Sequence, residues 1–294
     1  MTTVQEQAVE VAGVTARVQV AGDGPPLVYL HGANGQAWLS GLELLAQRFR
    51  VHLPEHPGFG DTERPNGLET AQDMAIFYLD LFEAMGLEGV NLVGQSLGGW
   101  IAAEMASLCA HPLRRLVLVD AAGLRLPGEQ HRMDMFALSP ADLVRSIYHD
   151  PALVERVLAI EPTPEQMRAQ VRARNMTARL GWNPYLCNPA LRARLRRVPV
   201  PTLVVWGAQD RLIPVAHAYA FAQAIPDARV ALIEACGHVP AMEQPGEFAH
   251  VVSEFLAAPS ADGPTPAGRP GLERASGVPG HCSTGPEPSS SKGR

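Results

Sequence analysis

Short apolar runs, each ending in a polar or glycine-rich turn, alternate along this chain with segments of helical pattern. The runs at 26–32, 90–94, 115–121, 201–207 and 229–235 are apolar almost throughout. Strands that are apolar on both sides fit a sheet whose two faces are both covered by helices. The alternation therefore predicts an α/β fold with a mostly parallel central sheet flanked by helices.

Local signals refine this expectation at two places. Residues 8–22 alternate in polarity and turn at Gly13, which predicts two strands joined as a hairpin. A helix is expected to begin after Thr70, with Asp73 three residues later as its capping partner, and to stop at Gly86.

The strand–helix alternation stops between residues 124 and 197, where prolines divide a helical pattern into short pieces. We interpret this stretch as a helical cap inserted between two core strands; ordinary packing helices are the alternative. The predicted organisation is a core in two parts, 1–123 and 198–258, with the cap at 124–197. Residues 259–294 are dominated by Pro, Gly and Ser, a composition that predicts a disordered tail.

Composition excludes several classes of protein. The chain has 294 residues and a net charge of −6, with no basic run of the kind that binds nucleic acid. No apolar run reaches the roughly 18 residues of a membrane span, and the first residues lack the pattern of a signal peptide. The four cysteines are scattered, so neither a metal site nor a disulfide framework is expected. We expect a cytoplasmic protein without metal or cofactor that acts on a small molecule; a homo-oligomer is left open.

The segment "NLVGQSLGGW" places three glycines within a few residues of Ser96. The pattern G-x-S-x-G, after a buried strand and before a helix, is typical of a nucleophile elbow. At such a turn the serine backbone is strained, and its neighbours must lack bulk. We therefore predict Ser96 as a nucleophile at the carboxyl edge of the sheet, rather than as an incidental serine in a glycine-rich turn.

A serine nucleophile needs a base and a carboxylate that orients it. His238 follows the last core strand, and Asp210 follows the strand before it. The order Ser96, Asp210, His238 is the order expected for a Ser–Asp–His triad on this kind of sheet. Asp120 also lies at a strand end and is the competing acid.

An oxyanion needs two hydrogen-bond donors. The backbone N–H of Leu97 is the first candidate, and the loop "HGANG" supplies Ala33 as the second. We expect His31, which opens that loop, to brace it. Trp100 and Val239 lie beside the catalytic residues in the sequence and are candidates for lining the substrate pocket.

Five segments, "HGANG", "PEHPGFGDTERP", "GQSLGG", "WGAQDRLIP" and "GHVPAMEQP", span about residues 25 to 257. In these the chain resembles the capped single-domain serine hydrolases of the α/β-hydrolase fold. The resemblance implies action on esters, lactones or some C–C bonds; dehalogenases and epoxide hydrolases of this fold use aspartate as nucleophile, which Ser96 argues against. Meta-cleavage product hydrolases are also similar, but they usually carry tryptophan and asparagine where this chain has Val239 and Gln95.

The expected function is a cofactor-independent carboxylesterase that acts on small to medium acyl esters through an acyl-enzyme. One alternative is a C–C bond hydrolase of aromatic ring-fission products, in which Arg174 or Arg179 of the cap would bind the substrate carboxylate. A perhydrolase that uses the same serine with peroxide, and a non-catalytic binding module, are further alternatives.

Overall fold

The computed structural model describes residues 2–129 and 134–258. Its centre is an eight-stranded sheet in the order β1-β2-β4-β3-β5-β6-β7-β8. Pairs from β4 to β8 are parallel, whereas β1 pairs with β2 and β2 with β4 in antiparallel fashion. The predicted α/β class with a mostly parallel sheet is confirmed. The strands are β1 (Gln5–Val11), β2 (Val14–Ala21), β3 (Pro26–Leu30), β4 (Arg50–Pro54), β5 (Val90–Gln95), β6 (Leu113–Val119), β7 (Thr202–Gly207) and β8 (Ala228–Ile233).

The predicted hairpin at the amino terminus is confirmed. Strands β1 and β2 are joined by Ala12 and Gly13, whose φ angles are both positive, at 51° and 78°. Two residues with positive φ give a turn whose twist matches that of the paired strands.

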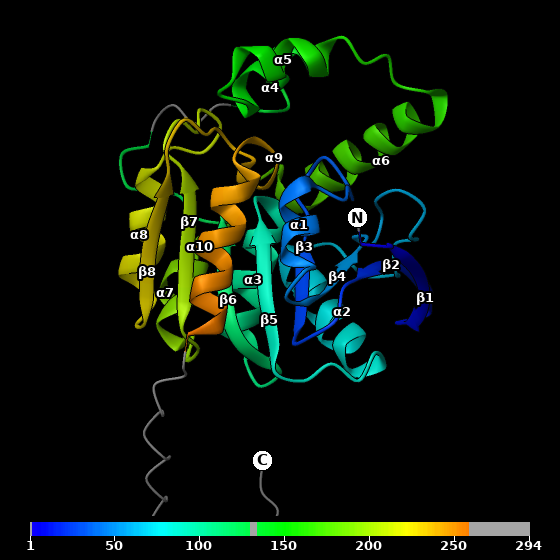
Figure 1. Cartoon of the computed structure of the whole chain (residues 1–294), viewed down its shortest axis with the longest axis vertical. Helices are drawn as coiled ribbons and strands as arrows, with labels where there is room; N and C mark the ends of the chain where they lie inside the picture. Colours follow the sequence, from blue (N-terminus) through cyan, green and yellow to red (C-terminus); the bar gives the residue numbers. More distant parts are fainter. Residues whose placement is uncertain (1, 130–133, 259–294) are drawn as a thin grey trace, which may run out of the picture. The chain divides into compact units, whose positions relative to one another are not determined.

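Helices cover both faces of the sheet. One face carries α1 (Ser40–Leu45) and α10 (Pro245–Ala257), and the short α9 (Pro240–Glu243) contacts both of them (Figure 1). The other face carries α2 (Ala71–Ala84), α3 (Leu97–Leu108) and α8 (Ala216–Ala224). Strands β5, β6 and β7 lie between these layers and are buried nearly throughout, as expected for a sheet covered on both sides.

The predicted signals for α2 are confirmed. The Thr70 side chain accepts a hydrogen bond from the Asp73 N–H, and the Asp73 carboxylate accepts one from the Thr70 N–H. The helix ends at Ala84, and Gly86 takes a φ of 63° two residues later. Reciprocal capping satisfies two N–H groups that have no partner within the helix.

The long connection between β6 and β7 is helical. It contains α4 (Pro140–Ile147), α5 (Pro151–Leu158) and α6 (Pro164–Gly181), which we call the cap helices. Each begins with proline directly after a capping Ser, Asp or Thr side chain, because proline suits the first helical position and lacks an N–H that would need a partner. Figure 1 shows these helices beyond the carboxyl ends of the parallel strands.

The end of the connection, up to residue 197, packs differently from the cap helices. Helix α7 (Leu191–Arg194) and the single 3-10 turn η1 (Leu195–Arg197) pack against α3 and α8, and Leu191 and Leu195 are fully buried there. These residues therefore pack with the helices that cover the sheet. An isolated parallel bridge between Gly123 and Cys187 ties the start of the connection to its end.

Among the described residues, no helix combines the length and the apolar character needed to cross a membrane. The tail predicted at 259–294 lies outside the described residues.

Candidate active site

Ser96 lies at the sharp turn from β5 into α3. Its φ and ψ are 55° and −113°, a conformation that is rare for residues other than glycine. The Ser96 N–H donates to the Val119 carbonyl of β6 at 2.9 Å, which fixes the turn to the neighbouring strand. The strained backbone and the strand-to-helix position are those of a nucleophile elbow.

The glycines around Ser96 are explained by the backbone that surrounds them. A Cβ on Gly94 would lie 2.4 Å from the Gly98 carbonyl oxygen, and one on Gly98 would lie 2.1 Å from the Leu30 carbonyl oxygen. A Cβ on Gly99 would meet the Cβ of Ala121 at 2.6 Å. Helix α3 therefore approaches β3, β5 and the end of β6 more closely than any side chain permits.

Substitution Gly98→Ala tests this close approach. The added methyl group would displace backbone atoms of β3, and overpacking of this kind costs about 1–3 kcal/mol of unfolding free energy. Gly246→Ala in α10 is the control, because no atom lies within 4 Å of the added Cβ. Urea unfolding should show a loss for Gly98→Ala alone; equal stability of the two variants would contradict the packing argument.

Ser96, His238 and Asp210 form a continuous hydrogen-bonded chain. His238 Nε2 lies 2.9 Å from Ser96 Oγ, and His238 Nδ1 lies 2.7 Å from Asp210 Oδ2. The other Asp210 oxygen accepts the N–H groups of Leu212 and Ile213 at 2.8 and 2.9 Å, so the carboxylate cannot rotate away. An acceptor-only carboxylate at Nδ1 requires the ring proton there, which leaves Nε2 free to accept the serine proton.

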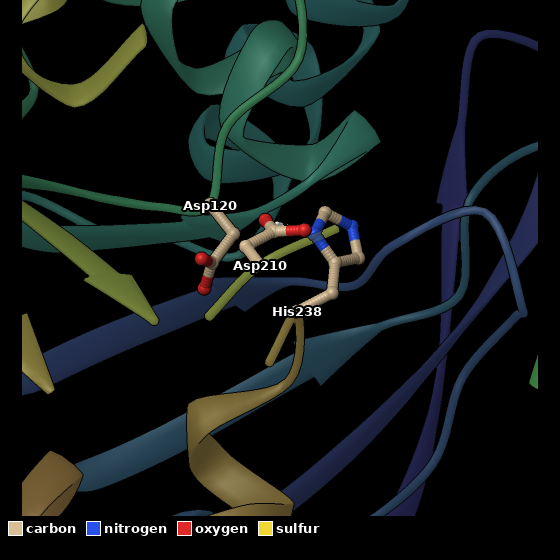
Figure 2. Close-up of side chains that lie close together, drawn as sticks. All are labelled: Asp120, Asp210 and His238. Carbon is tan, nitrogen blue, oxygen red and sulfur yellow. Dashed lines mark hydrogen bonds and ion pairs between the residues drawn. The ribbon is translucent and has the colours of Figure 1, made fainter. Parts of the chain in front are cut away.

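Asp120, the competing acid, lies behind Asp210 rather than beside the imidazole (Figure 2). Its side chain is fully buried and accepts the Gly207 N–H at 2.9 Å. A carboxylate oxygen of Asp120, a carboxylate oxygen of Asp210 and a ring nitrogen of His238 all lie within 4.8 Å of one another. Burial, and then the charge of Asp210, raise the pKa of Asp120 well above its usual range. Both causes favour the protonated form of the Asp120 carboxyl group.

The proposed oxyanion donors belong to residues that surround the serine. Ala33, Ser96 and Leu97 line the same pocket. The Leu97 N–H is the first of α3, where unpaired N–H groups and the helix dipole favour a negative charge.

Two buried histidines brace the loop that carries Ala33. The His56 N–H donates to His31 Nε2 at 3.0 Å, and His31 Nδ1 lies 2.7 Å from the Gly32 carbonyl oxygen. His56 Nε2 lies 2.7 Å from the His31 carbonyl oxygen, while His56 Nδ1 contacts the Tyr78 hydroxyl. Each ring therefore has one nitrogen that donates to a carbonyl and one that accepts, which is the pattern of neutral imidazole. His31 braces the loop, as the sequence predicts.

These histidines make stability depend on pH. Burial lowers the pKa of His31 from 6.5 to about 4 and that of His56 well below 6.5. Below pH 6.5 these histidines bind protons in the unfolded chain but stay neutral in the folded chain. Their contribution to the free energy of unfolding is therefore fully present above pH 6.5 and is lost as the pH falls toward 4. From His31 alone we expect a loss of about 2 kcal/mol between pH 7 and pH 5.

Urea unfolding of the parent and of His31→Gln at the two pH values isolates this part of the pH dependence, because the raised pKa of Asp120 acts in the opposite direction in both proteins. His250→Gln, at an exposed position, is the control. A pH dependence of His31→Gln equal to that of the parent would contradict a neutral His31 in the folded protein.

The backbone of His238 is also fixed, by contacts that the sequence did not reveal. Its N–H donates to the Ile147 carbonyl oxygen at the end of α4, at 2.7 Å. Its carbonyl oxygen accepts the Gln95 side-chain amide at 3.1 Å. Gln95 precedes the serine, so a residue of the elbow itself holds the histidine loop. Both contacts join residues far apart in sequence, and only Gln95, by its place in the motif, carried a signal that could have found it.

The pocket beside Ser96 is small, with a cavity volume of about 10 Å³, and none of the described residues that line it carries a charged side chain. Core loops and cap residues both contribute to it. The lining residues are Ala33, Ser96, Leu97, Ala122, Met135, Thr177, Tyr185, Leu186, Leu212 and Ile213. Met135, Thr177, Tyr185 and Leu186 belong to the connection between β6 and β7, which thus closes the site from above.

Two expected pocket residues do not line this pocket. The Trp100 indole N–H donates to Glu104 Oε1 at 3.1 Å, and the Trp100 ring packs near Gly123 within the core. Position 100 is four residues after Ser96, about one turn along α3, and the Trp100 side chain is buried in the apolar core cluster. Val239 directly follows the histidine, but it is buried in the apolar core cluster.

The two cap arginines considered as carboxylate ligands also lie outside this pocket. Arg179 forms an ion pair with Glu69 at 2.6 Å, with both side chains about half exposed. The Arg174 guanidinium donates to the Phe136 carbonyl oxygen at 2.6 Å.

Comparison with known proteins agrees with this geometry. A family model described as alpha/beta hydrolase fold matches residues 25–245. The chain is 30% identical over 267 residues to a 2-hydroxy-6-oxo-6-(2'-aminophenyl)hexa-2,4-dienoic acid hydrolase of Metapseudomonas resinovorans, which covers 85% of this chain and 90% of the relative. It is 28% identical over 260 residues to a pimeloyl-[acyl-carrier protein] methyl ester esterase of Aeromonas hydrophila, covering 83% of this chain and 100% of the relative. A crystal structure of a serine hydrolase involved in carbazole degradation superposes with a TM-score of 0.69 at 28% identity, covering 86% of this chain and 99% of that one.

Proposed function

Because the chain belongs to the alpha/beta hydrolase fold family, we propose that this hydrolase cleaves the C–C bond next to a ketone in 2-hydroxy-6-oxo-dienoate compounds. The observation that carries the proposal is the match over 85% of the chain to a hydrolase named for such a compound. The proposal replaces the carboxylesterase expected from the sequence as the first candidate.

The roles of the site residues follow from its geometry. Ser96 Oγ attacks the ketone carbon while His238 Nε2, 2.9 Å away, takes the serine proton. Asp210 holds the imidazole in the productive tautomer and stabilises its cation. The N–H groups of Ala33 and Leu97 bind the oxyanion, and the loss of one such donor costs about 3–4 kcal/mol in a comparable enzyme.

The same residues complete the reaction. Before cleavage the proton of the 2-hydroxyl group moves to C5, which gives a 2-oxo-3-enoate in which C5 is tetrahedral. When the C5–C6 bond breaks, its electron pair passes into this 2-oxo-3-enoate as a dienolate, and the imidazolium of His238 returns the proton to that fragment. The acyl group remains on Ser96. Water, deprotonated by His238, then attacks the acyl carbon and releases the second carboxylic acid.

A carboxylesterase is the second candidate, and the uncharged pocket favours it. Within residues 2–129 and 134–258, no residue that lines the pocket carries a cation for a substrate carboxylate, and Arg174 and Arg179 are engaged elsewhere. One of the relatives is named as a methyl ester esterase. An ester of a small, uncharged acid would need no cation.

A paired assay separates the two candidates. In one assay, purified protein is mixed with a 2-hydroxy-6-oxo-6-aryl-hexa-2,4-dienoate, and turnover is measured as the loss of the visible absorbance of that compound. In the other, the same protein is assayed on a series of p-nitrophenyl esters. Ser96→Ala is the control for both. The C–C proposal predicts the higher kcat/KM on the dienoate; a preference for esters with no turnover of the dienoate would contradict it and assign the second candidate.

A further inference from the structure

The Glu243 side chain joins two segments of backbone near the candidate base by accepting three of their N–H groups. One carboxylate oxygen accepts the N–H of Gly237 at 2.9 Å and the N–H of Val239 at 3.4 Å. The other oxygen accepts the N–H of His149 at 2.6 Å. Gly237 and Val239 flank His238 on both sides, whereas His149 lies between cap helices α4 and α5.

The cap segment 147–149 also touches the histidine loop directly. The His238 N–H donates to the Ile147 carbonyl oxygen at 2.7 Å. The two backbones are so close that a Cβ on Gly237 would lie 2.3 Å from the Ile147 carbonyl oxygen and 2.9 Å from the His149 nitrogen. Consecutive N–H groups at 237, 238 and 239 are therefore all satisfied by Glu243 or by the cap.

We propose that Glu243 is a positioning residue that fastens cap segment 147–149 to the backbone on both sides of His238, so that the orientation of the imidazole depends on the docked cap. The inference rests on the catalytic role proposed above for His238. A carboxylate suits this task because both of its oxygens only accept, and hydrogen bonds to a charged acceptor are the stronger ones. Glutamine would turn an NH₂ group toward one of the N–H donors and break one of the two connections.

Glu243→Gln tests the proposal, with Glu254→Gln as the control. Glu254 is an exposed glutamate of α10, so the control makes the same chemical change at a distance. On p-nitrophenyl acetate we expect kcat to fall about tenfold to a hundredfold for Glu243→Gln, because small misplacements of a catalytic group have effects of this size. KM should change little. The proton NMR signal of the Nδ1–H between His238 and Asp210 should shift or broaden, and the control should match the parent protein.

A second variant tests the cap side of the connection. His149→Pro removes the N–H that Glu243 accepts, and Tyr148, at φ −102° and ψ 140°, already has the extended backbone required before proline. His149→Ala keeps the N–H and is the reference. The proline variant should show a further loss of kcat and the same change in the His238 signal.

Three outcomes would overturn the inference. One is a parent-like kcat and NMR signal in Glu243→Gln. Another is a fall in melting temperature with kcat intact, which would mean a purely structural role. The third is equal activity of the two His149 variants. Ser96→Ala is assayed alongside: if it stays active, the proposed function fails, whereas an inactive Ser96→Ala beside a parent-like Glu243→Gln removes only this inference.

Discussion

Ser96→Ala should abolish turnover and leave the fold intact. The substitution removes one oxygen at a turn whose backbone is fixed by the Val119 carbonyl and by close packing of Gly94 and Gly98. Activity on an activated ester should fall by roughly a million-fold, as in a comparable triad in which the members act as a unit. Thermal unfolding should stay within a few degrees of the parent protein.

His238→Ala should cause a loss of similar size, and the double variant should lose little more. Both residues serve one step, because a single hydrogen bond of 2.9 Å connects Oγ to Nε2. Steady-state kinetics on p-nitrophenyl acetate measure all three variants. Losses that add when the two substitutions are combined would mean that Ser96 and His238 do not act in the same step.

Asp210→Asn should reduce kcat by roughly ten-thousand-fold, the effect of the equivalent change in a comparable enzyme. The asparagine oxygen can still accept the N–H groups of Leu212 and Ile213, so the site stays assembled. Its NH₂ group then faces His238 Nδ1, which must become an acceptor. The ring proton moves to Nε2, and that nitrogen can no longer accept the serine proton.

Asp120→Asn is the matched comparison for Asp210→Asn. Asparagine is close in shape to a neutral carboxylic acid, it accepts the Gly207 N–H through its oxygen, and it tolerates the φ of 44° found at position 120. We expect a loss of at most about tenfold, or about 1.4 kcal/mol. A large loss for Asp120→Asn with near-parent activity for Asp210→Asn would assign the orienting acid to Asp120.

The features that could be predicted from the sequence are those that local rules decide. Parallel strands place their carboxyl ends at one edge, so residues in the loops that follow these strands are placed at the same edge by topology; Ser96, Asp210 and His238 are such residues. The glycines around Ser96 report a close approach of backbones, and a proline after a capping residue marks the start of each cap helix. None of these inferences requires knowing where a side chain points.

The features that the sequence did not predict depend on where side chains point and on contacts between residues far apart in the chain. Trp100 is near Ser96 in the chain, but one turn of α3 carries its indole to Glu104, which also binds Asn188 and Arg194. That buried carboxylate holds the end of the connection between β6 and β7 to α3. Glu243 contacts the backbone on both sides of His238, and no motif spacing encodes those contacts.

Covalent labelling tests the central claim, that Ser96 is a nucleophile activated by His238. The protein is mixed with a p-nitrophenyl ester and quenched in acid, and the acylated peptide is located by mass spectrometry. We expect a burst of p-nitrophenol of about one equivalent per active chain and an acyl group on Ser96 alone. Ser96→Ala should show neither, and His238→Ala should form the adduct far more slowly. An adduct on another residue, or an undiminished burst from Ser96→Ala, would contradict the account.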